Sequence, residues 1–125
     1  MSLSTFIILL ASIMTASTAQ LFLKKGALAL RGLSLSWSAL SDLILSVFRN
    51  RWLFSGGVLF VISFFFYIFS LSKLNLSFAY PVMVSLGMVL VLLGSQLFLG
   101  ENLSWLQVLG IILILFSIYL LTPRN

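Results

Sequence analysis

Three polar side chains share one face of the first apolar run. Ser17, Gln20 and Lys24 follow one another at i, i+3 and i+7, which places them together on a helix. Such a face can line a polar path, with Lys24 or Lys25 holding an anion such as phosphate at its mouth. A structural interpretation stays open, because small residues occur at helix contacts in membranes and a Lys at a helix end extends to lipid headgroups. For the two lysines alone, headgroup contact is the simpler interpretation.

The chain lacks the side chains on which most catalysis depends. It has no Cys and no His, and Asp42 and Glu101 are its two acidic residues. These facts exclude disulfides, metal sites built on Cys or His, and catalysis by Cys or His, and they do not indicate paired-carboxylate chemistry. We expect no enzyme activity, no metal ion and no cofactor. The pI is about 10.3, but few basic residues lie together, so nucleic acid is not an expected partner.

The first apolar run carries no acid. A proton-coupled exporter of cations needs an ionisable acid within the membrane, and the sequence from Leu3 to Leu23 has none. An uncharged polar path with basic residues at its mouth suits an anionic or amphiphilic substrate better.

The composition requires lipid as the solvent. Of the 125 residues, 62% are hydrophobic and 7% are charged, whereas soluble domains carry about 25% charged residues. About 20 apolar residues span a bilayer as a helix. The first run lacks the basic n-region of a signal peptide, so we expect it to be retained. The sequence predicts an all-α integral membrane protein, one domain over 1–125 with four transmembrane helices at about 3–23, 52–72, 76–99 and 103–121.

The longest loop contains a second kind of helix. Between about 33 and 48 the apolar residues recur at helical spacing, while serines, Asp42 and Arg49 fall largely on the other side. This pattern predicts an amphipathic helix on the membrane surface, with Trp37 at headgroup level. The alternative is a hydrophobic loop packed over the bundle.

The basic residues predict an orientation. The first and third loops share one side of the membrane and hold Lys24, Lys25, Arg31, Arg49 and Arg51, whereas Lys73 and Arg124 lie on the other side. By the positive-inside rule the loops with more basic residues are cytoplasmic, so both termini should lie outside.

The start of the third span adds to the predicted site. Tyr80 is either an interfacial anchor or a ligand contact, and Pro81 fits a first helical turn. Glu101 is predicted to cap the last helix, whose N-terminus favours negative charge. The predicted substrate path comprises Ser17, Gln20, Lys24, Lys25, Tyr80, Pro81 and Ser85.

Small residues repeat in the last two spans. Gly87 and Gly94 are seven residues apart, and so are Gly110 and Ser117. Small residues at this spacing form smooth faces that let another helix approach closely. We predict packing within the chain or dimerisation at these four positions.

Several motifs resemble the drug/metabolite transporter superfamily. The sequence from 73 to 121 resembles the second half of an EamA-type repeat, through AYP at 79–81, LGE at 99–101 and LG at 109–110. The segment AQLFLKKGA at 19–27 is similar to the small ArnE/ArnF-type subunits that flip aminoarabinose-phosphoundecaprenol. The small multidrug resistance family is a sister group, but its acid two turns before the basic residue is replaced here by Ala16.

The resemblance implies a function and a partner. It implies a flippase that moves a polyprenyl-phosphate-linked sugar or a similar anionic lipid between leaflets of the bacterial inner membrane. Because four helices make half of a typical transport path, it also implies an antiparallel homodimer or heterodimer with a related four-helix chain. The alternatives are small multidrug resistance-like efflux of hydrophobic compounds and a non-transporting subunit of a membrane glycosyltransferase.

Overall fold

The chain folds into α-helices joined by short segments. A computed structural model describes residues 2–34 and 36–122. A single 3-10 turn, Leu28–Leu30, extends the first helix, and a π-helical turn, Ser95–Leu99, extends the fourth. The α-helices are α1 (Leu3–Ala27), α2 (Trp37–Arg49), α3 (Arg51–Leu71), α4 (Leu76–Gly94) and α5 (Trp105–Leu121).

Three helical segments are long and apolar enough to cross a membrane. They are Leu3–Leu30, Arg51–Leu71 and Leu76–Leu99, and they correspond to the first three predicted spans. The described residues contain helices and no strand, which confirms the all-α class. α5 is apolar but has 17 residues, fewer than the about 20 that usually span a bilayer. A fourth crossing therefore stays a prediction.

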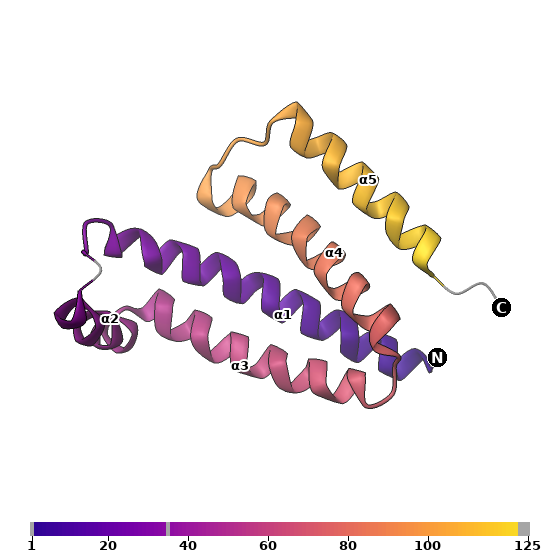
Figure 1. Cartoon of the computed structure of the whole chain (residues 1–125), viewed down its shortest axis with the longest axis horizontal. Helices are drawn as coiled ribbons and strands as arrows, with labels where there is room; N and C mark the ends of the chain where they lie inside the picture. Colours follow the sequence, from indigo (N-terminus) through magenta and orange to yellow (C-terminus); the bar gives the residue numbers. More distant parts are fainter. Residues whose placement is uncertain (1, 35, 123–125) are drawn as a thin grey trace.

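The helices are arranged around α1 (Figure 1). α1 lies between α3 and α4, antiparallel to α3, while α5 lies outermost beside α4, and α2 is turned out of the direction of the others at one end. Leu9 and Ile13 of α1 form the buried core with Val82 of α4. The start of α1 and the end of α5 lie at the same end of the structure as the turn between α3 and α4.

α1 and α3 pack through two reciprocal contacts of glycine with leucine. A Cβ on Gly26 would lie 2.8 Å from the backbone nitrogen of Leu53, and a Cβ on Gly56 would lie 3.0 Å from that of Leu23. Only glycine allows the two backbones to come this close. Nearer the middle of α1, the Ser12 hydroxyl donates to the Ser63 carbonyl oxygen at 2.9 Å.

Two helix boundaries differ from the prediction. α1 continues beyond residue 23 through both lysines, so Lys24 and Lys25 are helical. α2 begins later than residue 33, because Ser36 caps it by accepting a hydrogen bond from the Ala39 amide at 3.2 Å. Two residues used in the sequence predictions lie outside the described residues: Leu35, in the predicted interfacial helix, and Arg124, in the orientation argument.

Two predicted structural roles are wrong. Pro81 is not in the first turn, because α4 already begins at Leu76. Its missing N–H therefore leaves the Ser77 carbonyl without its usual helical donor. Glu101 does not cap α5, because its amide donates back to the Ser95 carbonyl at 3.2 Å and ends the preceding helix.

The actual cap of α5 is a capping box three residues further on. The Ser104 hydroxyl accepts from the Gln107 amide at 3.3 Å, and the Gln107 side chain accepts from the Ser104 amide at 2.7 Å. This reciprocal pair satisfies two amides that the first turn cannot. Gly100, with φ of +70°, makes the left-handed turn between the two helices.

Candidate functional site

A groove of about 480 Å³ lies mainly between α1 and α4. Four polar residues contribute to its walls, Ser17 and Gln20 from α1, Tyr67 from α3 and Tyr80 from α4. The rest of the lining is apolar or glycine: Ile13, Ala16, Met83, Val84, Gly87, Met88, Val91 and Leu92. The groove therefore combines an apolar body with a few polar groups, as ligand pockets commonly do.

On the α1 side, the two predicted path residues differ in what they can offer a ligand. The buried Ser17 hydroxyl donates to the Ile13 carbonyl oxygen at 2.8 Å and lies 3.5 Å from that of Gly87. Its single proton is thus already used within the protein. Gln20 is exposed and makes no hydrogen bond within the described part of the chain. Its amide is the group on this wall that can both donate to and accept from a ligand.

Tyr67 is a polar groove residue that was not among the predicted path residues. Its hydroxyl oxygen is buried, and it has no hydrogen-bond partner among residues 2–34 and 36–122. A buried hydroxyl without a partner is costly in an apolar environment. The available signal was its place in the run SFFFYIF at 63–69, where Tyr is the one aromatic residue with a polar tip. Tyr67, Tyr80 and Pro81 also line an adjoining, almost wholly apolar groove.

The structure gives Lys24 and Lys25 different partners. Lys24 follows Gln20 by one turn on the groove face of α1, and its Nζ lies 3.9 Å from a carboxylate oxygen of Glu101. Both side chains are about half exposed, at 52% and 51%. An ion pair with this exposure contributes little stability, so Lys24 can exchange its partner. Since Glu101 follows the π-helical turn that extends α4, the pair links α1 to the end of that helical segment, one turn of α1 beyond the groove residue Gln20.

Lys25 is held by aromatic rings. Its Nζ lies 4.2 Å from the centre of the Trp52 ring and 4.5 Å from that of Phe98. Phe22 completes the cluster, edge-on to Trp52 at 5.1 Å and stacked on Phe98 at 6.0 Å. Cation–π contacts of this kind stabilise by about 0.5–2 kcal/mol. Lys25 thus connects α1, α3 and the π-helical turn, and it does not line the groove.

The remaining predicted path residues lie away from the groove. Ser85 is on α4 but is not among the residues that line it. Pro81 lines the adjoining apolar groove instead. The structure therefore brings Ser17, Gln20 and Tyr80 together, with Lys24 at their edge.

The four small residues fall into two pairs. Gly87 and Gly94 face α1, since a Cβ on Gly87 would lie 3.8 Å from the Ser17 hydroxyl oxygen and one on Gly94 would contact the Leu21 side chain. On α5, a Cβ on Gly110 would meet nothing within 4 Å. Ser117 is exposed and donates to the Leu113 carbonyl of its own helix at 2.9 Å. The α5 pair forms a face that no other part of the described chain covers.

Neither acid of the chain lies in the groove. Asp42 is on α2, and Glu101 is at the half-exposed pair described above. The described residues contain no group of three or more His, Cys, Asp or Glu that could hold a metal ion. The groove walls are thus uncharged.

Comparisons with known proteins identify the family. Residues 37–114, more than half of the chain, match the sequence model described as Small Multidrug Resistance protein. The chain is also 40% identical over 63 residues to the "probable 4-amino-4-deoxy-L-arabinose-phosphoundecaprenol flippase subunit ArnE" of Aeromonas hydrophila subsp. hydrophila. That alignment covers 50% of this chain and 54% of the relative, so the chain matches about half the length of that protein. No solved structure matches.

These findings confirm the resemblance drawn from the AYP, LGE and AQLFLKKGA segments. They also agree with the apolar helices, three of which are long enough to cross a bilayer. Transport rather than catalysis is the activity that goes with such a family. The chain is a multi-pass membrane protein that belongs to the Small Multidrug Resistance family.

Proposed function

We propose that the protein moves a polyprenyl-phosphate-linked sugar, or a similar anionic lipid, between the leaflets of the bacterial inner membrane. The observation that carries the proposal is the uncharged groove between α1 and α4, whose apolar walls carry a few polar groups, with Lys24 one helical turn beyond Gln20. The lipid chain stays in the bilayer, so only the headgroup needs a polar route. Family membership and the flippase-subunit relative support transport of this general kind.

The groove offers neutral hydrogen-bonding groups to the headgroup. An unpaired ion in an apolar medium costs tens of kcal/mol, and each hydrogen bond to a charged group returns about 1.5–3 kcal/mol. The Gln20 amide and the Tyr67 and Tyr80 hydroxyls are the candidate partners. The same groups suit the hydroxyls of a sugar.

Lys24 draws the phosphate to the groove from the cytoplasmic leaflet. Its present partner, Glu101, is a single carboxylate at 3.9 Å in a half-exposed position, and a phosphate offers more oxygen atoms to the same ammonium. Lys25 has a packing role in the aromatic cluster. This division modifies the prediction that both lysines serve the substrate.

The site is completed by a second chain. α5 packs mainly beside α4, and none of its residues is buried. We assign it as the fourth span and its Gly110 and Ser117 face as the dimer contact, with an identical or related chain inserted the other way up. By the positive-inside rule the first and third loops are expected in the cytoplasm, and this single preferred orientation favours a related partner over an identical one.

Efflux of hydrophobic cations is the second candidate, since the family match itself favours it. Proton-coupled export needs an acid in the membrane, and the uncharged groove supplies none. A resistance phenotype that disappears when the proton gradient is dissipated would support efflux. Co-purification with a membrane glycosyltransferase, without flipping, would support an accessory role.

A flipping assay tests the proposal. In proteoliposomes we would follow how fast a fluorescent short-chain polyprenyl-phosphate-linked sugar becomes accessible to a membrane-impermeant quencher. We expect Gln20→Leu and Tyr80→Phe to slow flipping roughly tenfold, which corresponds to about 1.4 kcal/mol. Thr18→Val is the matched control, because Thr18 lies outside the groove and donates to the Met14 carbonyl of its own helix. An equal loss in the Thr18 variant would show that the groove is not the route.

A further inference from the structure

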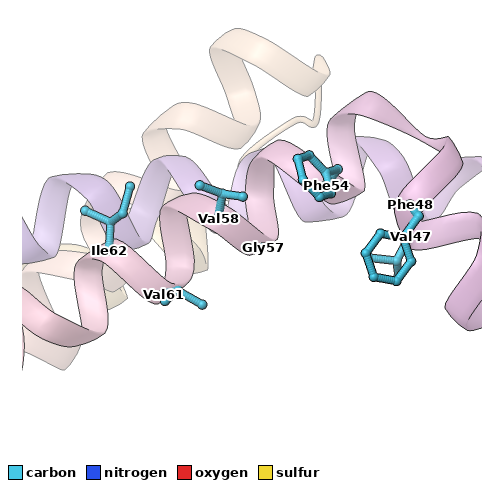
Figure 2. A pocket seen from close by; sticks show the side chains of 7 residues that line it. All are labelled: Val47, Phe48, Phe54, Gly57, Val58, Val61 and Ile62. Carbon is cyan, nitrogen blue, oxygen red and sulfur yellow. The ribbon is translucent and has the colours of Figure 1, made fainter.

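A separate, wholly apolar groove lies at the junction of α2 and α3 (Figure 2). Its volume is about 410 Å³. α2 forms one wall with its last turn, and α3 forms the other with the outward side of its first three turns. The lining residues are Val47, Phe48, Phe54, Gly57, Val58, Val61 and Ile62.

This groove faces away from the bundle. α3 contacts α1 through Leu53, Gly56 and Ser63, which are buried. The groove residues lie on the opposite side of the same helix, and Val58 and Val61 are 45% and 54% exposed. The groove therefore opens onto the bilayer, where an apolar surface is covered by hydrocarbon chains.

The angle between the two helices is fixed by Asn50, the residue that joins them. Its side-chain oxygen accepts from the Trp52 amide at 3.0 Å, which caps α3, and its side-chain nitrogen donates to the Gly26 carbonyl of α1 at 3.4 Å. Because one side chain ties the junction to α1, the groove is formed by the fold itself. Phe48 and Phe54 lie at the junction end of the groove, with ring centres 6.2 Å apart.

Two arginines flank that junction. Arg49 ends α2 and Arg51 begins α3, and both are exposed. Neither has a carboxylate partner in the described part of the chain, where Lys24 and Glu101 form the ion pair. On α3, Arg51 precedes Phe54 and Val58 by three and seven residues, so its Cα lies on the groove side of the helix. Its guanidinium carbon lies 5.6 Å from the centre of the Trp52 ring, an exposed contact that a phosphate can replace. At the start of a span, arginines lie at the level of the lipid headgroups.

We propose that this groove binds an anionic diacyl phospholipid of the bilayer. One acyl chain fills the groove, and the phosphate is held by Arg49 and Arg51, whose guanidinium groups match phosphate oxygens. The bound lipid would fasten α2 to the membrane surface. The site lies on the face of α3 opposite the α1–α4 groove, and it does not depend on the proposed transport.

The test is a competition for lipid binding without transport. The purified protein is incubated with equal amounts of phosphatidylglycerol and phosphatidylcholine carrying the same acyl chains, and retained lipids are counted by native mass spectrometry. We expect phosphatidylglycerol to be retained in excess. Arg49→Gln and Arg51→Gln should each lower that excess about fivefold, the effect of about 1 kcal/mol per arginine near an anionic surface. Arg31→Gln, the matched control in the same loop, should leave it unchanged.

A second variant tests the acyl-chain part of the site. A Cβ on Gly57 would meet nothing within 4 Å, and Gly57 lines the groove, so the ring of Gly57→Phe would occupy the space proposed for the acyl chain. It should remove most retention of phosphatidylglycerol, whereas Gly57→Ala should remove little. Equal retention of the two lipids by the unchanged protein, or an equal loss in Arg31→Gln, would overturn the proposal. A change of oligomeric state in Gly57→Phe would instead assign the groove to a contact between chains.

Discussion

The neighbouring glycines of α3 provide a matched test of the helix packing. Gly56 faces α1, and a Cβ there would lie 3.0 Å from the Leu23 backbone nitrogen and 2.9 Å from its Cγ. Gly57, the next residue, has nothing within 4 Å of that position. The perturbation is Gly→Ala at each site in turn.

The expected magnitudes follow from two opposing effects. Alanine favours the helix over glycine by about 0.5–1 kcal/mol, and this gain is common to both variants. Overpacking costs about 1–3 kcal/mol, and it applies only to Gly56, where the added methyl group would meet Leu23 of α1. We therefore expect Gly57→Ala to stabilise slightly, and Gly56→Ala to have a free energy of unfolding about 1–3 kcal/mol lower than Gly57→Ala. Gly26→Ala should be at least as damaging as Gly56→Ala, because its Cβ would lie 2.8 Å from the Leu53 backbone nitrogen.

Equilibrium unfolding by SDS in mixed micelles, followed by tryptophan fluorescence, measures these differences. The comparison of Gly56→Ala with Gly57→Ala cancels the propensity of alanine and leaves the steric effect. If the two variants agree within about 0.5 kcal/mol, α1 and α3 do not pack as described.

Three further outcomes are expected. Tyr67→Phe removes the unpartnered hydroxyl, so flipping should slow roughly tenfold while the protein is no less stable to SDS. Lys25→Met should lower the free energy of unfolding by about 1–2 kcal/mol through loss of its contacts with Trp52 and Phe98, whereas Lys24→Met should change it by less than about 0.5 kcal/mol. Gly110→Leu adds a side chain where nothing lies within 4 Å, so crosslinked dimer should decrease several-fold while the helix content measured by circular dichroism stays the same.

A specific result would contradict each of these three predictions. Normal flipping by Tyr67→Phe would remove that hydroxyl from the headgroup route. Equal stability of the two Lys variants would mean that the aromatic cluster contributes nothing. An undiminished dimer in Gly110→Leu would move the contact to another face.

The apolar segments were predictable because hydrophobic length alone defines them. The limits of α3 and the end of the fourth helical segment at Leu99 agree with the sequence to within about one residue. α1 runs past Leu23 because an apolar count stops at the first charge, whereas a helix does not. The predicted start of the last span, at about residue 103, lies two residues before the observed start of α5 at Trp105. The capping box of Ser104 and Gln107 sets this start, and an apolar count does not include such a local signal.

The site was predictable only along a single helix. Ser17 and Gln20 do share a groove, because i and i+3 spacing fixes their common face. The sequence predicts that Lys24 and Lys25 point about 100° apart on a helix. It does not predict their partners, Glu101 and Trp52, because these come from other elements of the fold. Tyr67 was missed for the same reason: its role depends on how α3 packs against α1 and α4.

The most direct test of the account compares two classes of substrate in the same proteoliposomes. The uncharged groove predicts that a fluorescent polyprenyl-phosphate-linked sugar changes leaflets, and that an imposed proton gradient does not drive accumulation of a hydrophobic cation. Proton-driven accumulation of the cation, with the anionic lipid left in its original leaflet, would contradict the account.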